Sequence, residues 1–509
     1  MRLNKPSLRN FFCNIYMTFK STIAIITSIG NTMLCWGYPN CGNLSPNIHE
    51  KTIKNNELSF SSSDKKVENT FNWAKKTALS YAHDGNDPVG YWYEAALPGR
   101  NAFCMRDASH QCIAAEMLGL SKHNFNIMKK FAENINDSKD WCTFWEIDKY
   151  NKPCSADYLD DANFWYNLNA NFDVIFACQR LYEWTGNERY LKDETLAKFF
   201  QLSVNEYVER WRLEPENILL RTQEINIKPT SKGRWRGVRG LPSYVENYPG
   251  LTNSSDLVAS LYGGFEAYSK MLATLGQKAE SEKFHFQAEE YRRHLEEDWW
   301  NDENKTYHTF WTKDNQFADG EGLTYMLWFN AAQEKERIQG TIKKMMERKN
   351  WNIENISHFP LLWYRYNYTQ KAYDILTTIT SMHRFEYPEV SYGMIEGIVS
   401  GAMGIVPEAS RKRVTTLPKI IGEHYLQIDN LPLLSGLISV RHDGNKATRF
   451  TNNTTDTLTW EAAYTGKVDE LTVNGKKQKT KSRTDLMGNI ISYIEVSVTP
   501  KMEVQVNIE

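Results

Sequence analysis

Three acidic residues stand where a polar loop runs into a helix of small and aromatic residues: Asp107, Glu321 and Glu389. Paired carboxyl groups can perform acid–base catalysis, in which a protonated acid gives its proton to a leaving oxygen and a carboxylate activates water or attacks carbon. Glu321 lies between two glycines in ADGEGLTYMLWF and is the predicted acid, because poor solvation raises the pKa of a carboxyl group. Glu389 is the predicted base. A carboxylate in the first turn also stabilises a helix, and this alternative stays open for all three.

The same loops and helix starts hold candidates for substrate binding. Arg106, Asp107 and His110 form the densest polar cluster, MRDASHQ. The remaining candidates are Trp92, Arg100, Asp161, His358 and Tyr387. Capping of a helix is the stronger explanation for Asp161. The chain holds 16 Trp and 27 Tyr, and the apolar faces of sugar rings stack on such side chains, so the composition suits carbohydrate chemistry.

Six polar helix starts recur along the chain and predict how these residues are positioned. They are Arg106-Asp107, Asp160-Asp161, Ser255-Asp256, Asp319-Gly-Glu321, Ser357-His358 and Pro388-Glu389. Every interval between them has room for two helices of about 12 residues with short connections. Mixed-charge helices alternate with helices that are apolar nearly all round, as an outer and an inner ring require. The six starts are therefore expected to converge on one mouth, with a small β excursion over it within residues 219–255.

The pattern changes to period two after about residue 415. Short alternating segments such as LTVNGKK and ISYIEVSV are separated by turn sequences, as in a β-sandwich. The predicted division is a targeting segment over 1–41, a linker over 42–66, a helical catalytic domain over 67–414 and an antiparallel β-sandwich over 415–509. The fold class is mainly α.

The N-terminal segment and the overall charge bear on location and partners. Lys20 followed by STIAIITSIGNTMLCWG resembles a secretory signal, with Met17 as the expected start, and its apolar run is too short for a stable membrane span. We expect a periplasmic or extracellular protein, with lipid anchoring at Cys35 less favoured. A net charge of −2 without a basic stripe argues against nucleic acid. No paired metal-ligand spacing indicates a metal site, no cofactor is implied, and the oligomeric state is not indicated.

Several phrases resemble the six-hairpin glycosidases, the (α/α)6-barrel enzymes. LYEWTGNERYL and DWWNDENKTYHTFW are similar to their hairpin connections, EYPEVSYGMIEGIVSGAMGIVPEA resembles their last inner helix, and WEAAYTGKVDELTVNGK resembles the sandwich of α-L-rhamnosidase-like members. The resemblance implies an (α/α)6 barrel, a C-terminal β-sandwich and hydrolysis of glycosidic bonds. It also shows a departure, since Asn101 and Ala102 stand where rhamnosidases carry acidic residues, and only Arg100 and Asp107 remain.

Three functions follow as alternatives. The leading one is an exported glycoside hydrolase that removes terminal sugars, with uronic acid and rhamnose considered, from an oligosaccharide or polysaccharide. A uronic acid would suit the arginines of the presumed mouth loops, which are Arg100, Arg106, Arg234, Arg236 and Arg239. A polysaccharide lyase acting by β-elimination would use Tyr387 or His358 as its base. A non-catalytic glycan-binding relative would explain the missing acid at Ala102.

Overall fold

The computed structural model describes residues 57–221, 226–227, 238–246, 248 and 250–508 of the chain. The predicted targeting segment and most of the predicted linker lie outside the described residues, as do Arg234, Arg236 and the side chain of Arg239. Helices hold 44% of the described residues and strands 25%. The predicted mainly helical chain with a β-rich C-terminal part is therefore confirmed.

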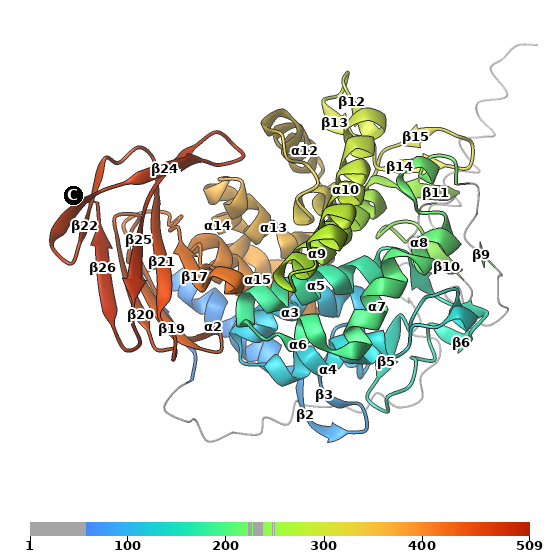
Figure 1. The fold of residues 1–509 in the computed structure, drawn as a ribbon, viewed down its shortest axis with the longest axis horizontal. Coiled ribbons are helices and arrows are strands. Elements are labelled where there is room, and N and C mark those ends of the chain that lie inside the picture. Colours follow the sequence, from blue (N-terminus) through green and yellow to red (C-terminus); the bar gives the residue numbers. More distant parts are fainter. Residues whose placement is uncertain (1–56, 222–225, 228–237, 247, 249, 509) are drawn as a thin grey trace, which may run out of the picture. The chain divides into compact units, whose positions relative to one another are not determined.

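Six buried helices form a closed ring, because each contacts the next along the chain and the last contacts the first. Figure 1 shows this helical part of the chain beside the C-terminal strands. They are α3 Met105–Met117, α5 Ala170–Thr185, α9 Ser255–Thr274, α11 Leu323–Trp328, α13 Ile353–Arg365 and α15 Pro388–Glu396. Nearly every residue of α3 and α15 is buried. Helices that are apolar nearly all round can bury more than one face, which accounts for their place inside.

A second set of helices covers this ring and alternates with it along the chain. These are α2 Lys65–Ser80, α4 Ser121–Ala132, α7 Glu194–Val204, α10 Lys278–His294, α12 Lys335–Glu347 and α14 Thr369–Thr378. Each packs against a helix of the inner ring. In addition, α7 contacts α4, and α14 contacts α2. Their charged residues lie on an exposed face, as in α10, where only Phe284, Ala288 and Tyr291 are buried. Two short helices, α6 Arg189–Lys192 and α8 Glu206–Trp211, flank α7.

Glycines let the inner helices approach closely. A Cβ atom added to Gly264 of α9 would lie 2.8 Å from Cβ of Phe172 on α5 and 3.2 Å from its Cα. Gly264→Ala is therefore expected to lower the free energy of unfolding by about 1–3 kcal/mol through overpacking. Denaturant unfolding measures this change. Lys270→Ala, on the exposed side of the same helix, should stay within about 0.5 kcal/mol, and an equally stable Gly264→Ala would contradict the tight packing.

The C-terminal strands form two sheets whose inner faces meet where the rings of Phe450 and Trp460 stack at 5.2 Å. One sheet has the order β1 Ser59–Ser62, β18 Tyr425–Leu433, β19 Gly436–Asp443, β20 Ala447–Asn452, β26 Glu503–Asn507, β22 Glu470–Val473 and β23 Lys476–Lys479. The other has the order β16 Val406–Glu408, β17 Arg413–Thr416, β21 Leu458–Thr465, β25 Ile490–Val498 and β24 Lys481–Thr484.

Two details of these sheets differ from the prediction. Strand β1 lies within the predicted linker. Its four residues pair with β18 through backbone hydrogen bonds and form the edge of this sheet. Strands β17 and β21 run parallel, so the second sheet is mixed rather than wholly antiparallel.

Short strands connect the helices at the end of the ring where the inner helices begin. They are β2 Ala82–Asp87, β3 Gly90–Tyr93, β4 Ala102–Cys104, β5 Glu146–Asp148, β6 Tyr158–Asp160, β7 Asn163–Phe164, β8 Tyr166–Asn167, β9 Asn226–Ile227, β10 Val238–Leu241, β11 Leu251–Ser254, β12 Trp300–Asn301, β13 Thr306–Tyr307, β14 Phe310–Thr312 and β15 Phe317–Ala318. The expected β excursion thus contains β9, β10 and β11. No helix among the described residues is long and apolar enough to cross a membrane.

Three of the six predicted helix starts are displaced. Asp160 and Asp161 lie in the hairpin of β6 and β7, and the inner helix begins only at Ala170. His358 lies in the second turn of α13, which begins after Asn352, whose side chain accepts a hydrogen bond from the backbone N–H of Asn355. Glu321 lies in the loop before Leu323. A continuous apolar run does not by itself distinguish strand from helix, which explains the first displacement.

Candidate active site

The starts of α3, α13 and α15 bring three carboxyl groups together around one arginine. Asp107 lies in the first turn of α3, Glu354 in the first turn of α13 and Glu389 in the first turn of α15. Arg106 is buried among them, and its guanidinium lies 3.3 Å from Asp107 and 3.3 Å from Glu354. A fourth carboxyl group, that of Glu246, lies 3.5 Å from the same guanidinium. We call these five residues the carboxyl cluster.

Asp107 does not cap its helix. The residue before α3 is Cys104, and no side chain caps this helix start. The carboxylate of Asp107 instead accepts a hydrogen bond from the Cys104 thiol at 3.1 Å and faces the Arg106 guanidinium. Helix capping, the ordinary explanation for an aspartate at a helix start, therefore does not explain Asp107.

Glu389 is the most deeply buried acid of the carboxyl cluster, with 6% of its surface exposed. Burial raises its pKa well above the usual value, and the carboxylates of Asp107 and Glu354 raise it further because a third negative charge is unfavourable there. Among the described residues, no group hydrogen-bonds to Oε2 of Glu389. Glu389 is therefore suited to carry a proton at neutral pH.

Two further acids of the cluster, Glu246 and Glu354, are more exposed than Glu389 and also hold protons more tightly than usual. Partial burial raises the pKa of Glu246 to about 6, against the lowering effect of Arg106. The pKa of Glu354 is raised by the same cause, again opposed by Arg106. One arginine thus faces four carboxyl groups, and the surplus of negative charge keeps part of the cluster protonated.

The loop that carries Glu246 is held by a buried aspartate. Asp256, in the first turn of α9, accepts hydrogen bonds from the hydroxyls of Ser243 and Ser254 and from the backbone N–H of Tyr244. Its burial raises its pKa to about 7. Asp256 therefore positions the loop rather than facing the carboxyl cluster.

Aromatic and histidine rings pack beneath the carboxyl cluster. His110 lies 3.0 Å from Asp173 through Nε2, and the hydroxyl of Tyr244 donates to the same carboxylate oxygen at 2.6 Å. The rings of Tyr244 and Tyr325 stack at 3.7 Å. The ring of His358 lies 4.9 Å from that of His110. Burial lowers the pKa of both histidines well below the usual value, so they are neutral at neutral pH.

Glu321 lies at the edge of this arrangement. Its carboxylate pairs with Arg348 at 2.7 Å and accepts a hydrogen bond from the Asn355 side chain at 3.3 Å. Burial raises the pKa of Glu321, Arg348 lowers it, and the charge of Glu354 adds a further increase, which puts Glu321 within electrostatic range of the cluster. Its firm pairing makes Glu321 a weaker candidate for the acid than Glu389.

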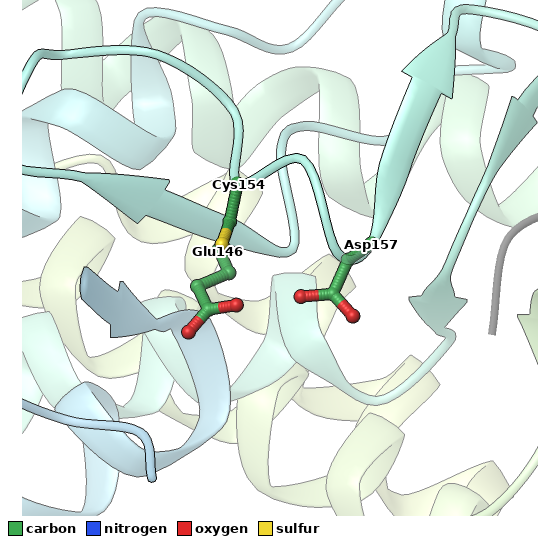
Figure 2. A group of neighbouring side chains, drawn as sticks. All are labelled: Glu146, Cys154 and Asp157. Atoms are coloured by element: carbon green, nitrogen blue, oxygen red, sulfur yellow. The ribbon is translucent and has the colours of Figure 1, made fainter. Parts of the chain in front are cut away.

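Arg100 is occupied by two acids of the protein. Its guanidinium lies 2.6 Å from Glu146 and 2.6 Å from Asp157. These carboxyl groups face each other beside Cys154, as Figure 2 shows, and the three side chains are close enough to share a cation. The guanidinium already supplies a positive charge there, and the pKa of Glu146 is raised well above its usual value by burial. Arg100 is thus a structural ion-pair partner in this state.

Three predicted binding residues make contacts of their own within the protein. Trp92 is fully buried, stacks on His83 at 3.9 Å and donates to Asp87, so it offers no face to a sugar. Asp161 is half-buried and accepts hydrogen bonds from the hydroxyls of Ser138 and Tyr158. Tyr387 precedes α15, and its hydroxyl accepts a hydrogen bond from Arg384. Burial and local pairing therefore give Trp92 and Asp161 structural roles.

The sequence reading missed Glu354 and Glu246. Glu354 would have been found if Asn352, rather than Ser357, had been read as the residue that begins α13. Glu246 lies in an irregular loop that has no periodic pattern in the sequence. The polar helix start at Asp256, whose side chain holds that loop, is the nearest feature that the sequence indicates.

A cavity of about 630 Å³ lies at the other ends of α5 and α13, next to β16 and β17. Its charged side chains are largely paired with one another, as in Arg180 with Glu396 and Arg483 with Glu461. The carboxyl cluster is therefore the better candidate for chemistry, although this cavity is the larger hollow.

No protein-family model and no curated protein matches the sequence. Solved structures do match. An α-L-rhamnosidase from Dictyoglumus thermophilum superposes with a TM-score of 0.60 at 12% identity, covering 89% of this chain and 50% of that one. A putative kojibiose phosphorylase from the human microbiome gives 0.54 at 11% identity, with 87% and 63% covered. An α-L-rhamnosidase from Aspergillus terreus gives 0.52 at 10% identity, with 88% and 50% covered.

The fold is like that of these solved α-L-rhamnosidases and of the kojibiose phosphorylase, as the resemblance to six-hairpin glycosidases implied. Identities near 12% establish the fold alone. The chain spans about half the length of the two rhamnosidases. The carboxyl cluster lies at the end of the ring where the inner helices begin, which is where the polar helix starts were expected to converge.

Proposed function

We propose that the protein is a glycoside hydrolase that removes terminal sugars, with the alternating helices acting as an (α/α)6 catalytic barrel. The carboxyl cluster supports this proposal most strongly. It combines a buried acid, Glu389, with a carboxylate, Asp107, that is paired with arginine. Hydrolysis of a glycosidic bond needs one carboxyl group of each kind.

The roles of the two acids follow from their surroundings. Glu389 is the proton donor to the leaving oxygen, because burial keeps it protonated. Asp107 is the carboxylate that activates water or attacks the anomeric carbon, because it lies in the same cluster as Glu389 and its side chain is oriented by Arg106 at 3.3 Å. This reverses the base role that the sequence suggested for Glu389 and moves the acid role away from Glu321.

The pairing of the arginines favours a neutral sugar over a uronic acid. Arg100 holds two carboxyl groups and Arg106 holds three, so neither guanidinium is available to a substrate carboxylate in this state. The likeness to α-L-rhamnosidases makes rhamnose the first neutral sugar to test.

Activity on aryl glycosides tests the function directly. We expect release of the aryl group from a neutral terminal sugar, with rhamnose, mannose, galacturonate and glucuronate compared at equal concentration. Selective turnover of a uronate would contradict the preference for neutral sugars. Formation of an unsaturated uronate, seen by its ultraviolet absorbance, would indicate elimination and contradict hydrolysis. Binding of glycans without any turnover would indicate a non-catalytic protein.

Export remains part of the proposal and rests on the segment from Met17 to Gly37. Cell fractionation followed by N-terminal sequencing tests it. A mature chain that begins beyond this segment is expected, and a chain that keeps Met1 inside the cell would contradict export.

A further inference from the structure

A small cavity of about 10 Å³ lies directly beneath Glu389, among the inner helices. Its lining includes Gln111 of α3, Glu389 of α15, and the two histidines beneath the carboxyl cluster, His110 and His358. This volume is about that of one water-sized sphere, so the cavity holds a single oxygen atom and no sugar ring.

Gln111 has unused hydrogen-bonding capacity at this cavity. Only 2% of its surface is exposed, and among the described residues neither its amide nitrogen nor its amide oxygen has a hydrogen-bond partner. Oε2 of Glu389, which lines the same cavity, is in the same condition. A buried polar atom without a partner costs about 1–3 kcal/mol. Three such atoms around one small cavity point to a bound partner that both donates and accepts hydrogen bonds.

The position of Gln111 in its helix links it to the carboxyl cluster. Gln111 follows Asp107 by four residues in α3, so the two side chains lie on one face of the helix, with Gln111 one turn deeper. Helix α15 packs against α3 and carries Glu389. The side chains of Asp107 and Gln111 therefore both lie toward the Glu389 carboxyl group, one helix turn apart.

We propose that this cavity binds one hydroxyl oxygen between the Gln111 amide and the Glu389 carboxyl group, and that Gln111 is thereby a positioning residue for Glu389. The oxygen is that of a water molecule or of a hydroxyl group on the terminal sugar. The binding site does not depend on the proposed function, whereas the positioning role of Gln111 rests on that function.

Gln111→Leu tests the positioning role, because leucine fills a similar volume and forms no hydrogen bond. We expect kcat/KM to fall about 10- to 100-fold, since the carboxyl group loses its fixed orientation. Loss of a hydrogen bond to the ionised carboxylate raises the pKa of Glu389, so the alkaline limb of the pH–rate profile should move upward by about one pH unit. A purely structural role would lower the folded fraction and leave that limb in place.

Gln179→Leu is the matched control, because Gln179 lies on the neighbouring inner helix and hydrogen-bonds to Glu183, away from the small cavity. Its pH–rate profile should not move. An unchanged rate and profile in Gln111→Leu would overturn the positioning role.

Crystal structures of the free and sugar-bound protein test the binding site itself and need no turnover. Electron density for an oxygen within hydrogen-bonding distance of Gln111 and Glu389 in the free protein identifies water, and density that appears only with the sugar identifies a sugar hydroxyl. An empty cavity in both states would overturn the site. If the oxygen is present but no glycoside is hydrolysed, the site stands and the proposed function fails.

Discussion

Glu389→Gln is expected to lower kcat by roughly 100- to 10,000-fold, because glutamine keeps the shape of the acid but cannot give a proton to the leaving oxygen. KM should change little, since the substitution removes no apolar surface. The alkaline limb of the pH–rate profile, which reports loss of the Glu389 proton, should disappear. Steady-state kinetics on the best aryl glycoside measure all three effects.

The stability of Glu389→Gln gives an independent reading of the same pKa. The folded protein binds the Glu389 proton more tightly than the unfolded chain, so stability falls as the pH rises from the unfolded pKa of about 4.3 toward the folded pKa. Glutamine has no such proton. The Tm of the variant should therefore match that of the parent at acidic pH and exceed it at higher pH, as scanning calorimetry would show.

Glu386→Gln is the matched control for this experiment. Glu386 lies three residues before Glu389 and is exposed to solvent. Its rates and its pH profile should equal those of the parent. Near-normal turnover in Glu389→Gln would remove Glu389 from the mechanism.

Asp107→Asn should lower kcat by a comparable factor, roughly 100- to 10,000-fold, because an amide cannot activate water or stabilise developing positive charge at the anomeric carbon. It should also change the acid on the facing helix. The Asp107 charge raises the pKa of Glu389 more than any other carboxylate does. Its removal should move the alkaline limb of the residual activity to lower pH.

This direction of shift distinguishes a direct role for Asp107 from misfolding, which would leave the limb in place. Asp161→Asn is the control, since Asp161 lies in the hairpin of β6 and β7 and is hydrogen-bonded to Ser138 and Tyr158. Full activity in Asp107→Asn would transfer the carboxylate role to Glu354 or Glu321.

Local signals in the sequence located two of the acids correctly. Pro388 fixes the first turn of α15, since proline is favoured at the first position of a helix. Asp107 precedes ASHQCIAAEMLGL, whose Ala, Gln, Glu, Met and Leu residues favour a helix. These signals act within one or two turns of the chain, so no knowledge of the rest of the fold was needed.

Local sequence patterns gave a wrong prediction where both a strand and a helix are compatible with the same segment. The segment DDANFWYNLNANFD mixes aromatic residues with Asp and Asn; its first part ends β6 and forms β7 and β8, and its last part begins α5. Pairing of β8 with β10, far along the chain, decides between strand and helix there. A segment cannot contain that information by itself.

The alternation of amphipathic and apolar helices, the change to period two near residue 415 and the acids at two helix starts are predictable from the sequence, because they are properties of neighbouring residues. The closed ring of helices sets which acids meet, brings Arg106 to both Asp107 and Glu354, and fixes which acid keeps its proton. Protonation depends on burial and on charges brought from separate helices, so it emerges only when the ring of helices closes.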